Sequence, residues 1–313
     1  MKNIFLINPS AGKGGGGRIA EKIKEAAKGL SIKVEIYETT GVGDGEKYVR
    51  FLCQSRTDHQ VLRFFACGGD GALSEVINGS FGYENVEVGC IPLGTGNDYV
   101  RNYGHPEDFL SIKGQLTGCS MDSDLIRYDQ VIDGDLVERY CVNMFNIGFD
   151  CNVVDLTRKV KQWPLIGGSL AYLVSVGIIL IKKKGAELTV YSEDEMVFDG
   201  KMLLIAIGNG CYCGGGIKGV PKAILDDGLM DVSLIRNMSR RCFIKLFPKY
   251  TKGVHLEEKN VDNLLIYNQC KKLTIIPKNG IMRLCTDGEI TMAEKVEFSI
   301  IPKGIKFIVP SKG

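Results

Sequence analysis

The chain has 313 residues, of which 39 are basic and 37 acidic, so its formal net charge is only +2. Such a balance provides no general positive field, and we therefore expect no nucleic-acid partner. Hydrophobic residues make up 44% and charged residues 24% of the chain, which excludes a disordered protein and, at this length, predicts about two domains.

The eleven cysteines are an odd number, and Met1-Lys2-Asn3 leads directly into a strand-like run without a signal peptide. We therefore expect reduced thiols and a cytoplasmic location. The only histidines are His59, His105 and His255, so no zinc-ligand spacing is present.

Strand-like and helix-like runs alternate over the first 120 or so residues, which predicts a parallel α/β sheet. The strand-like runs are Ile4 to Ile7, Val34 to Tyr37, Val61 to Ala66 and Val86 to Ile91, and the helix-like runs are Arg18 to Ala27, Glu46 to Gln54, Leu73 to Asn78 and the segment from Asn97 onward. Ligands of such sheets bind at the carboxyl ends of the strands.

From about Asp124 the pattern changes to strand-like runs separated by turns, which predicts a second domain built as an antiparallel β-sandwich. These runs are Leu136 to Met144, Leu188 to Tyr191, Met202 to Ile207, Leu229 to Ile235, Lys272 to Ile276, Lys295 to Ile300 and Ile305 to Val309.

A helix-length run over residues 165–181 interrupts these strands. Residues 163–181 carry no charge and are followed by Lys182-Lys183-Lys184. The length suits a membrane span, but Pro164 and several glycines favour a buried or membrane-contacting helix.

Three glycine-rich loops follow three of the predicted strands, and together they indicate a polyphosphate site. They are the segments Asn8 to Arg18, Gly68 to Gly71 and Pro92 to Asp98. Glycines permit positive φ and let an anion approach the backbone amides, and the second loop leads into a helix N-terminus, where phosphate binds. Asp70, Asn97 and Asp98 are suited either to bind magnesium or to hold these loops in shape.

Two acidic segments occur in the second half of the chain. Asp227 precedes Gly228, and the carboxylate with nearby carbonyl oxygens suits a hard cation, although the segment taken alone favours an ordinary Asp-Gly turn. Asp287-Gly288-Glu289 offers a general base and an orienting or metal-binding carboxylate, or alternatively a hairpin turn.

These segments, in this order, resemble the diacylglycerol kinase catalytic family, which comprises bacterial soluble lipid kinases related to the sphingosine and ceramide kinases. The resemblance covers nearly the whole chain and rests on Asn8 to Gly12, Gly68 to Gly71, Pro92 to Asp98, Asn146 to Asp150, Gly214 to Leu229 and Asp287 to Glu289. It implies an NAD-kinase-like ATP-binding α/β domain over residues 1–124, with a return of the chain at about 303–313. Residues 125–302 would form a β-sandwich for substrate and metal, with the active site in the cleft between the domains.

The resemblance also implies the site residues. Those contacting ATP would be Asn8, Pro9, Ser10, Ala11, Gly12, Thr39, Gly68, Gly69, Asp70, Gly71, Ala72, Leu73, Ser74 and Thr95, with Thr40 as an alternative to Thr39. Glu289 would be the catalytic base, with Asp287 as a second catalytic residue beside it. Asp227 and the carbonyls of Ile224 and Leu229 would bind a structural Mg²⁺, linked through water to Asp98 and to Asp124, for which Asp122 is a near alternative.

The implied activity is ATP-dependent phosphorylation of diacylglycerol or a similar lipid alcohol, at a peripheral contact with an anionic membrane surface. A sphingoid-base or other lipid kinase, an NAD-kinase-like transferase with a soluble acceptor, and a non-catalytic lipid or nucleotide sensor are the alternatives. Ala72 stands where the family usually has threonine, so the choice of nucleotide stays open, as does a homodimeric state.

Overall fold

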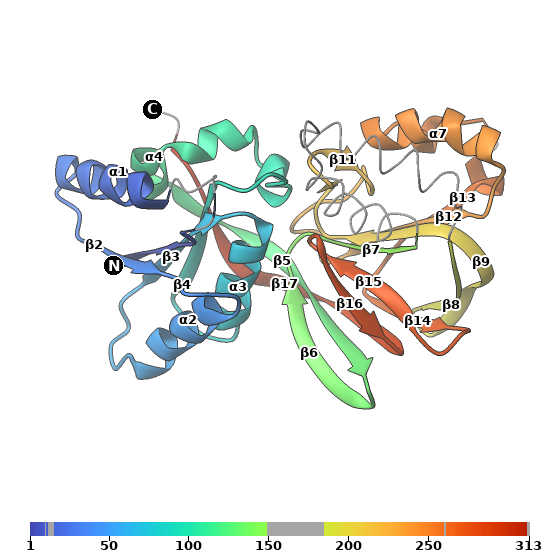
Figure 1. Ribbon diagram of the computed structural model, residues 1–313, viewed down its shortest axis with the longest axis horizontal. Coiled ribbons are helices and arrows are strands. Elements are labelled where there is room, and N and C mark those ends of the chain that lie inside the picture. The colour runs from blue at the N-terminus through green and yellow to red at the C-terminus, as the bar shows by residue number, and fades with distance from the viewer. Residues whose placement is uncertain (10, 12–15, 149–184, 260, 312–313) are drawn as a thin grey trace, which may run out of the picture. The chain divides into compact units, whose positions relative to one another are not determined.

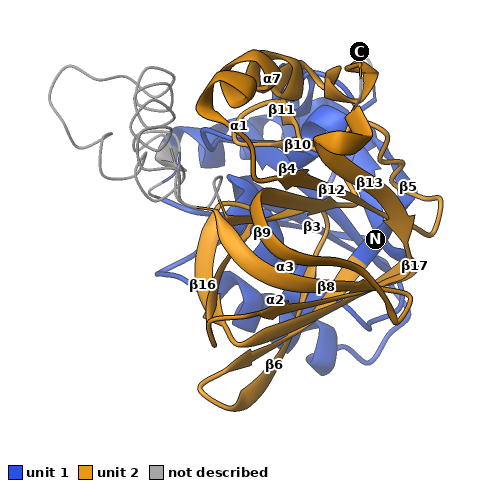
Figure 2. Ribbon diagram, turned by 90° about the vertical axis from the view of Figure 1, so that its right-hand side faces the viewer, with its two compact units in different colours: residues 1–125, 302–313 blue, residues 126–301 orange. Residues whose placement is uncertain are grey.

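The computed structural model describes residues 1–9, 11, 16–148, 185–259 and 261–311. The chain divides into two compact units (Figure 2). Unit 1 comprises residues 1–125 and 302–313, and unit 2 comprises residues 126–301. The helix expected over 165–181 and the lysines at 182–184 lie outside the described residues.

Unit 1 is built on a sheet in which all neighbouring strands are parallel, in the order β2-β1-β3-β4-β17. Its elements in chain order are β1 (Lys2–Ile7), α1 (Gly16–Gly29), β2 (Val34–Glu38), α2 (Asp44–Ser55), β3 (Leu62–Gly68), α3 (Asp70–Ser80), β4 (Val86–Pro92), the 3-10 helices η2 (Tyr99–Asn102) and η3 (Pro106–Leu110), α4 (Ile112–Thr117), the first part of β5 (Cys119–Ile132) and the last part of β17 (Lys295–Val309). The predicted parallel α/β domain is confirmed.

Helices cover both faces of this sheet (Figure 1). Ile23 of α1 and Leu116 of α4 pack with Phe5, Phe65 and Ile308 in one core cluster, while α2 and α3 cover the other face. Every residue of β3 is buried, because a central parallel strand is enclosed on both sides. This explains why β3 reads as an uninterrupted apolar run rather than as an alternating one.

The helix predicted from Asn97 onward is replaced by a loop and three short helices, η2, η3 and α4. Asn97 has a positive φ of 51°, and Gly104 a φ of 158°, so neither residue continues a helix. Pro106, at the first position of η3, starts a new turn instead.

Unit 2 consists mainly of antiparallel strands, as predicted. Its elements are the rest of β5 and β17, together with β6 (Asp135–Cys141), β7 (Met144–Gly148), β8 (Ala186–Ser192), β9 (Glu195–Gly208), β10 (Tyr212–Cys213), β11 (Ile217–Lys218), β12 (Met230–Arg236), α7 (Arg240–Lys252), the 3-10 helices η4 (His255–Glu257) and η5 (Val261–Asn263), β13 (Leu265–Cys270), β14 (Lys272–Pro277), β15 (Met282–Thr286) and β16 (Glu289–Ala293).

Strand β9 is shared by two parts of unit 2. Its first half pairs with β8, and its second half pairs with both β7 and β12. Ile205 and Ile207 point into the core of the β-strands, whereas Leu204 packs with Phe243 and Leu246 of α7. Both faces of this half are therefore covered, in keeping with its continuous apolar sequence.

Two of the predicted strands have different limits. The run Leu136 to Met144 is split into β6 and β7, and the predicted strands at 295–300 and 305–309 are one continuous strand, β17. Sequence patterns also missed α7, β5, β13, β15 and β16.

Candidate active site

The glycine-rich loops of unit 1 meet at the carboxyl edge of its sheet. Ile7 at the end of β1 is the register partner of Cys67 in β3, and Gly68 is the partner of Pro92 in β4. From β1 the chain proceeds to β2 on one side, and β3 lies on the other, so the strand order reverses between β1 and β3. This reversal is where open α/β sheets bind ligands.

The first loop begins at Asn8, whose backbone N–H donates to Cys67 O at 3.2 Å. A turn follows, in which Ala11 N–H donates to Asn8 O at 3.0 Å. The predicted contacts Asn8, Pro9 and Ala11 therefore lie beside the end of β3. Ser10 and Gly12 lie outside the described residues.

The second loop leads directly into α3, which begins at Asp70 and places its N-terminus at the same edge. A Cβ on Gly68 would lie 2.6 Å from the Cβ of Ala72, so only glycine allows the helix to start this close to the strand. Gly69, Gly71, Leu73 and Ser74 follow in the same loop and first turns of α3. The positive end of the helix dipole favours an anion here.

The third loop is locked onto the second. The backbone N–H groups of Leu93 and Gly94 both donate to Gly68 O, at 2.8 and 3.2 Å. A Cβ on Gly94 would lie 2.5 Å from Gly69 Cα, so the two backbones touch. Asn97 closes the loop by donating through Nδ2 to the carbonyls of Pro92 and Gly94. Thr95 lies exposed within this loop.

Asp70 connects these loops through its carboxylate. Oδ1 accepts a hydrogen bond from Asp98 N–H at 2.9 Å and a longer one from Tyr99 N–H at 3.5 Å. Burial raises the pKa of Asp70, while the backbone amides act in the opposite direction. Of the two roles that the sequence left open, these contacts support holding the loops in shape.

The structure distinguishes the surroundings of Thr39 and Thr40. Thr39 donates to Ile7 O through its N–H at 2.9 Å and through its hydroxyl at 3.3 Å, so it lies where β1 ends. Thr40 instead donates through both groups to the carboxylate of Asp44. Thr39 is therefore the one beside the first glycine loop.

Glu75 is a residue of this edge to which sequence reasoning gave no role. Its two carboxylate oxygens accept hydrogen bonds from Gly43 N–H at 2.8 Å and Gly45 N–H at 3.0 Å. These amides belong to the start of α2, where the N-cap Gly43 has no side chain to satisfy them. The missing Ser, Thr, Asp or Asn at that cap was the available signal.

Asp98 and Asp124 are both buried, at 6% and 0% exposure. Asp98 Oδ1 lies 3.6 Å from Nε of Arg101, and Asp124 Oδ1 accepts the N–H of Lys303 at 2.7 Å. Asp122, the near alternative to Asp124, is paired at the surface with the ammonium groups of Lys306 and Lys303. Asp124 is therefore the interior carboxylate of the two.

In unit 2, Asp287 and Gly288 form the turn between β15 and β16. Thr286 is the register partner of Glu289, and φ is 46° at Asp287 and 89° at Gly288, as in a two-residue type I′ hairpin. This segment therefore does form the hairpin turn that was one of its two interpretations.

The side chain of Asp287 is engaged by a neighbouring turn. Its Oδ1 accepts Met144 N–H at 3.1 Å, and its Oδ2 accepts the Cys141 thiol at 3.2 Å. Its own N–H donates to Met144 O at 3.1 Å. Glu289, by contrast, is exposed. Asp287 therefore fixes the turn that carries the exposed Glu289.

Asp227 lies in a turn closed by its own side chain. Asp227 is exposed, its Oδ1 accepts Leu229 N–H at 3.0 Å, and Gly228 has a φ of 76°. Within the described part of the chain no group of three His, Cys, Asp or Glu residues is placed to bind a metal. The donor that the structure shows is the exposed carboxylate of Asp227, and Mg²⁺ in proteins is often held by only one or two carboxylates with water.

Side chains from the strands hold this loop in place. The Tyr267 hydroxyl donates to Asp231 Oδ1 at 2.6 Å and accepts Lys222 N–H at 3.2 Å. Asn209 Nδ2 donates to Leu225 O at 3.4 Å. Asp231 has no exposed surface, and burial raises its pKa. A buried carboxylate thus sets the position of Tyr267, and Tyr267 sets the start of the loop.

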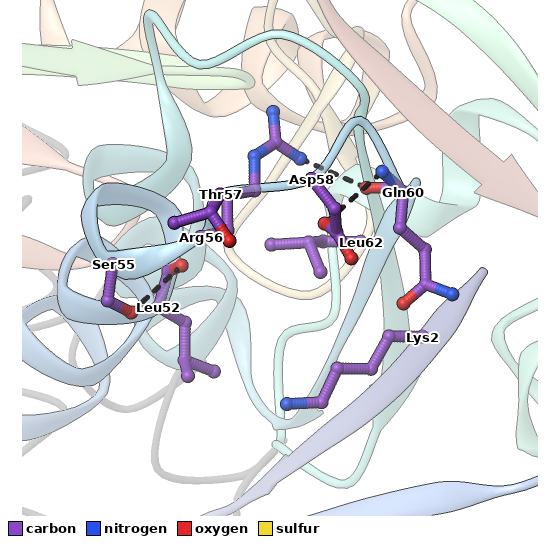
Figure 3. A pocket seen from close by; sticks show the side chains of 8 residues that line it. All are labelled: Lys2, Leu52, Ser55, Arg56, Thr57, Asp58, Gln60 and Leu62. Atoms are coloured by element: carbon purple, nitrogen blue, oxygen red, sulfur yellow. Dashed lines mark hydrogen bonds between the residues drawn. The ribbon is translucent and has the colours of Figure 1, made fainter.

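A hollow of about 250 Å³ in unit 1 does not belong to this site. It is lined by Lys2, Leu52, Ser55, Arg56, Thr57, Asp58, Gln60 and Leu62 (Figure 3). Lys2 and Leu62 are the first residues of β1 and β3, whereas the glycine loops follow their last residues. The hollow therefore lies at the opposite edge of the sheet.

No helix among the described residues is long and apolar enough to cross a membrane. The uncharged segment 163–181 lies outside the described residues.

Two family models match the chain in succession. Residues 2–128 match the diacylglycerol kinase catalytic domain, and residues 143–309 match the YegS C-terminal NAD kinase beta sandwich-like domain. The first range contains all three glycine loops, and the second contains Asp227, Asp287 and Glu289.

Similar proteins carry corresponding names. A "probable lipid kinase YegS-like" of Stenotrophomonas maltophilia is 27% identical over 293 residues, covering 91% of this chain and 89% of the relative. A diacylglycerol kinase of Mycobacterium tuberculosis is 26% identical over 319 residues, covering 100% and 96%. A "probable lipid kinase YegS-like" of Xanthomonas campestris is 30% identical over 225 residues, or 69% of each chain.

Among solved structures, a diacylglycerol kinase from Bacillus anthracis superimposes with a TM-score of 0.69 at 18% identity, covering 98% of this chain and 96% of the other. This likeness shows a shared fold and agrees with the predicted combination of an α/β domain and a β-sandwich-like domain.

Proposed function

The chain belongs to the lipid kinase family defined by the diacylglycerol kinase catalytic domain, and from this we propose that it phosphorylates diacylglycerol with ATP to give phosphatidic acid. The observation that carries the proposal is that the three glycine loops lie at one sheet edge, where the first is bonded to the end of β3 through Asn8 and the other two are joined through Gly68 and Asp70. An ordinary glycine turn does not have to be bonded to a second glycine loop. A polyphosphate site does require several backbone amide groups held in fixed positions.

ATP is the proposed phosphoryl donor. The loop at Asn8, the start of α3 and the loop at Thr95 supply the contacts for its phosphates, and Thr39 lies beside the first of them. Ala72 contributes no hydroxyl group, so phosphate binding relies on backbone amides and on the helix dipole.

Glu289 is the proposed general base. A lipid hydroxyl is a poor nucleophile at neutral pH, and a carboxylate within hydrogen-bond reach removes its proton as the oxygen attacks the γ-phosphorus. The new bond joins the lipid oxygen to the γ-phosphorus. The bond between the γ-phosphorus and the β–γ bridging oxygen of ATP breaks, and that oxygen leaves with ADP. Asp287 keeps the turn in place through its bonds to Met144 and Cys141, so its contribution is positioning.

Mg²⁺ is the proposed metal, held by Asp227 and by carbonyls of Ile224 and Leu229. The ion would supply positive charge, while the chain and water would supply its oxygen ligands. Asp231 and Tyr267 hold the start of this loop in position through their hydrogen bonds.

Diacylglycerol is preferred over the other acceptors because one family model and one relative are named for diacylglycerol kinase, and other relatives are named as probable lipid kinases. A sphingoid base is the second candidate within the same chemistry. In either case the acceptor is dissolved in a bilayer, so we also propose peripheral contact with an anionic membrane from the cytoplasmic side.

Incubation of the protein with labelled ATP, Mg²⁺ and a panel of acceptors tests the proposal. The panel contains diacylglycerol, a sphingoid base, NAD and a sugar, and the products are extracted into organic solvent. We expect label in the organic phase with diacylglycerol. Label carried only by NAD or the sugar would contradict a lipid acceptor, and label on the sphingoid base alone would replace diacylglycerol.

A further inference from the structure

Helix α7 carries positive charge without any compensating acid of its own. Its basic residues are Arg240, Arg241, Lys245, Lys249 and Lys252, and all five are exposed. Lys249 forms an ion pair with Glu258 beyond the end of the helix. The helix lies against β12 and β13, packing on Ile235 and Leu265 (Figure 1).

Three of these cations lie on one stripe. At 100° per residue, Arg241, Lys245 and Lys252 fall within about 40° of one another around the helix axis. The opposite side carries Phe243, Leu246 and Tyr250, which are buried in unit 2. Because that side is packed, the helix cannot rotate to bury its charges, and the stripe has a fixed direction.

An apolar side chain lies beside the stripe. Ile244 is 59% exposed, next in sequence to Lys245. Exposure of an isoleucine side chain to water is unfavourable. Beside the cations it can instead enter the boundary between lipid headgroups and acyl chains, while the cations contact the headgroups.

The exposed face of α1 provides a contrast within the same protein. Its exposed lysines, Lys22, Lys24 and Lys28, alternate with Glu21 and Glu25. A mixed face of this kind is typical of a solvated helix and attracts neither sign of charge strongly.

We propose that α7 is a membrane-docking surface, with Arg241, Lys245 and Lys252 binding anionic phospholipid headgroups and Ile244 inserting beside them. The inference rests on the proposed function in one respect, which is that the acceptor lies in a bilayer. The occupant is an anionic lipid surface because the stripe combines clustered cations with an exposed apolar group.

Vesicle co-sedimentation without ATP tests this surface. The probes are vesicles of phosphatidylcholine alone and vesicles containing phosphatidylglycerol, each at low and high salt. We expect binding only to the anionic vesicles and weaker binding at high salt, since the Debye length shrinks with ionic strength. The triple variant R241Q/K245Q/K252Q should lose roughly 100-fold in affinity, at about fivefold per cation.

Two further variants separate the contributions. I244S should weaken vesicle binding by about tenfold while leaving its salt dependence unchanged, because the isoleucine acts through apolar burial. The matched control K22Q/K24Q/K28Q on α1 removes the same charge and should bind like the wild type. Circular dichroism and thermal unfolding confirm that all variants fold.

The proposal is overturned if the α7 triple variant binds anionic vesicles as the wild type does, or if the α1 control loses as much affinity. It is also overturned if neutral vesicles bind equally well. Activity on a dispersed short-chain diacylglycerol is measured in parallel. Vesicle binding through α7 without any lipid phosphorylation would support this surface and contradict the proposed function.

Discussion

The carboxylate of Asp70 accepts a hydrogen bond from the backbone N–H of Asp98, 28 residues later in the chain, at 2.9 Å. This bond joins the start of α3 to the end of the loop after β4. Both loops carry proposed phosphate contacts, so the geometry of one depends on the other. Asp70, which lies in the glycine loop Gly68 to Gly71, therefore holds the backbone of the third loop in place.

Replacement of Asp70 by asparagine should weaken ATP binding and loosen the two loops together. The variant keeps the size of the side chain but loses a charge-assisted hydrogen bond, which contributes about 1.5–3 kcal/mol. We expect roughly tenfold weaker nucleotide binding by calorimetry and a lower thermal midpoint. Unchanged nucleotide affinity in a folded variant would contradict the connection between loops and ligand.

Replacement of Glu289 by glutamine should lower kcat by roughly 10²- to 10⁴-fold, because general-base catalysis contributes about that much. Nucleotide affinity should stay unchanged, since the proposed partner of Glu289 is the lipid hydroxyl and Glu289 is not among the proposed ATP contacts. The measurement is steady-state phosphorylation of dispersed diacylglycerol. D287N is the comparison, and it should also lower stability because its carboxylate binds Met144 and Cys141. Wild-type turnover in E289Q would remove Glu289 from the mechanism.

The Asp227 loop should respond to two different substitutions in two different ways. D227A should abolish any rise of the thermal midpoint with Mg²⁺, which in the wild type follows mass action on the folded state. Y267F removes the bond that Asp231 accepts at 2.6 Å and should shift the Mg²⁺ titration to higher concentration without abolishing the response. A wild-type midpoint indifferent to Mg²⁺ would count against the site.

The buried histidine of unit 2 predicts an acid-sensitive stability. His255 has no exposed surface, neither of its ring nitrogens has a hydrogen-bond partner among the described residues, and burial lowers its pKa to about 4. An unfolded histidine has a pKa of about 6.5. As the pH falls below that value, the unfolded chain gains a proton that the folded chain does not, so the free energy of unfolding decreases.

Urea unfolding at pH 7.5 and pH 5.0 measures this effect. The contribution of His255 should cost about 2 kcal/mol between the two pH values, since one pKa unit corresponds to about 1.36 kcal/mol. H255L, which cannot be protonated, should show a correspondingly smaller decrease. Equal decreases in the wild type and H255L would contradict the lowered pKa.

The parallel sheet and the meeting of its glycine loops could be predicted from the sequence, because the strands and loops there are determined by neighbouring residues in the chain. Val61 to Ala66 is apolar throughout, and the glycines that follow it have no local alternative to a turn. What the sequence could not predict depends on distant partners. Lys303 follows Pro302 and precedes Gly304, which reads as a turn, yet β17 continues through it.

The reason is the buried carboxylate of Asp124, which accepts the N–H of Lys303 while that residue has a φ of 53°. Similarly, α7 was missed because Pro248 interrupts its pattern and its cations dilute the apolar spacing, whereas its packing on β12 and β13 stabilises it. The role of Glu75 was equally invisible, since it satisfies amides 30 and 32 residues away.

The pairing of β17 with β4 sets an order of events during synthesis. Phe307 is the register partner of Val88, and Ser311 N–H donates to Gly114 O at 3.0 Å, so unit 1 uses residues from both ends of the sequence. A growing chain that has emerged only as far as β16 holds β4 with its outer edge unpaired. Such an edge can recruit a strand from another chain. Unit 1 is thus complete only after unit 2 has been translated, and a stop codon before residue 302 would leave the edge of β4 unpaired.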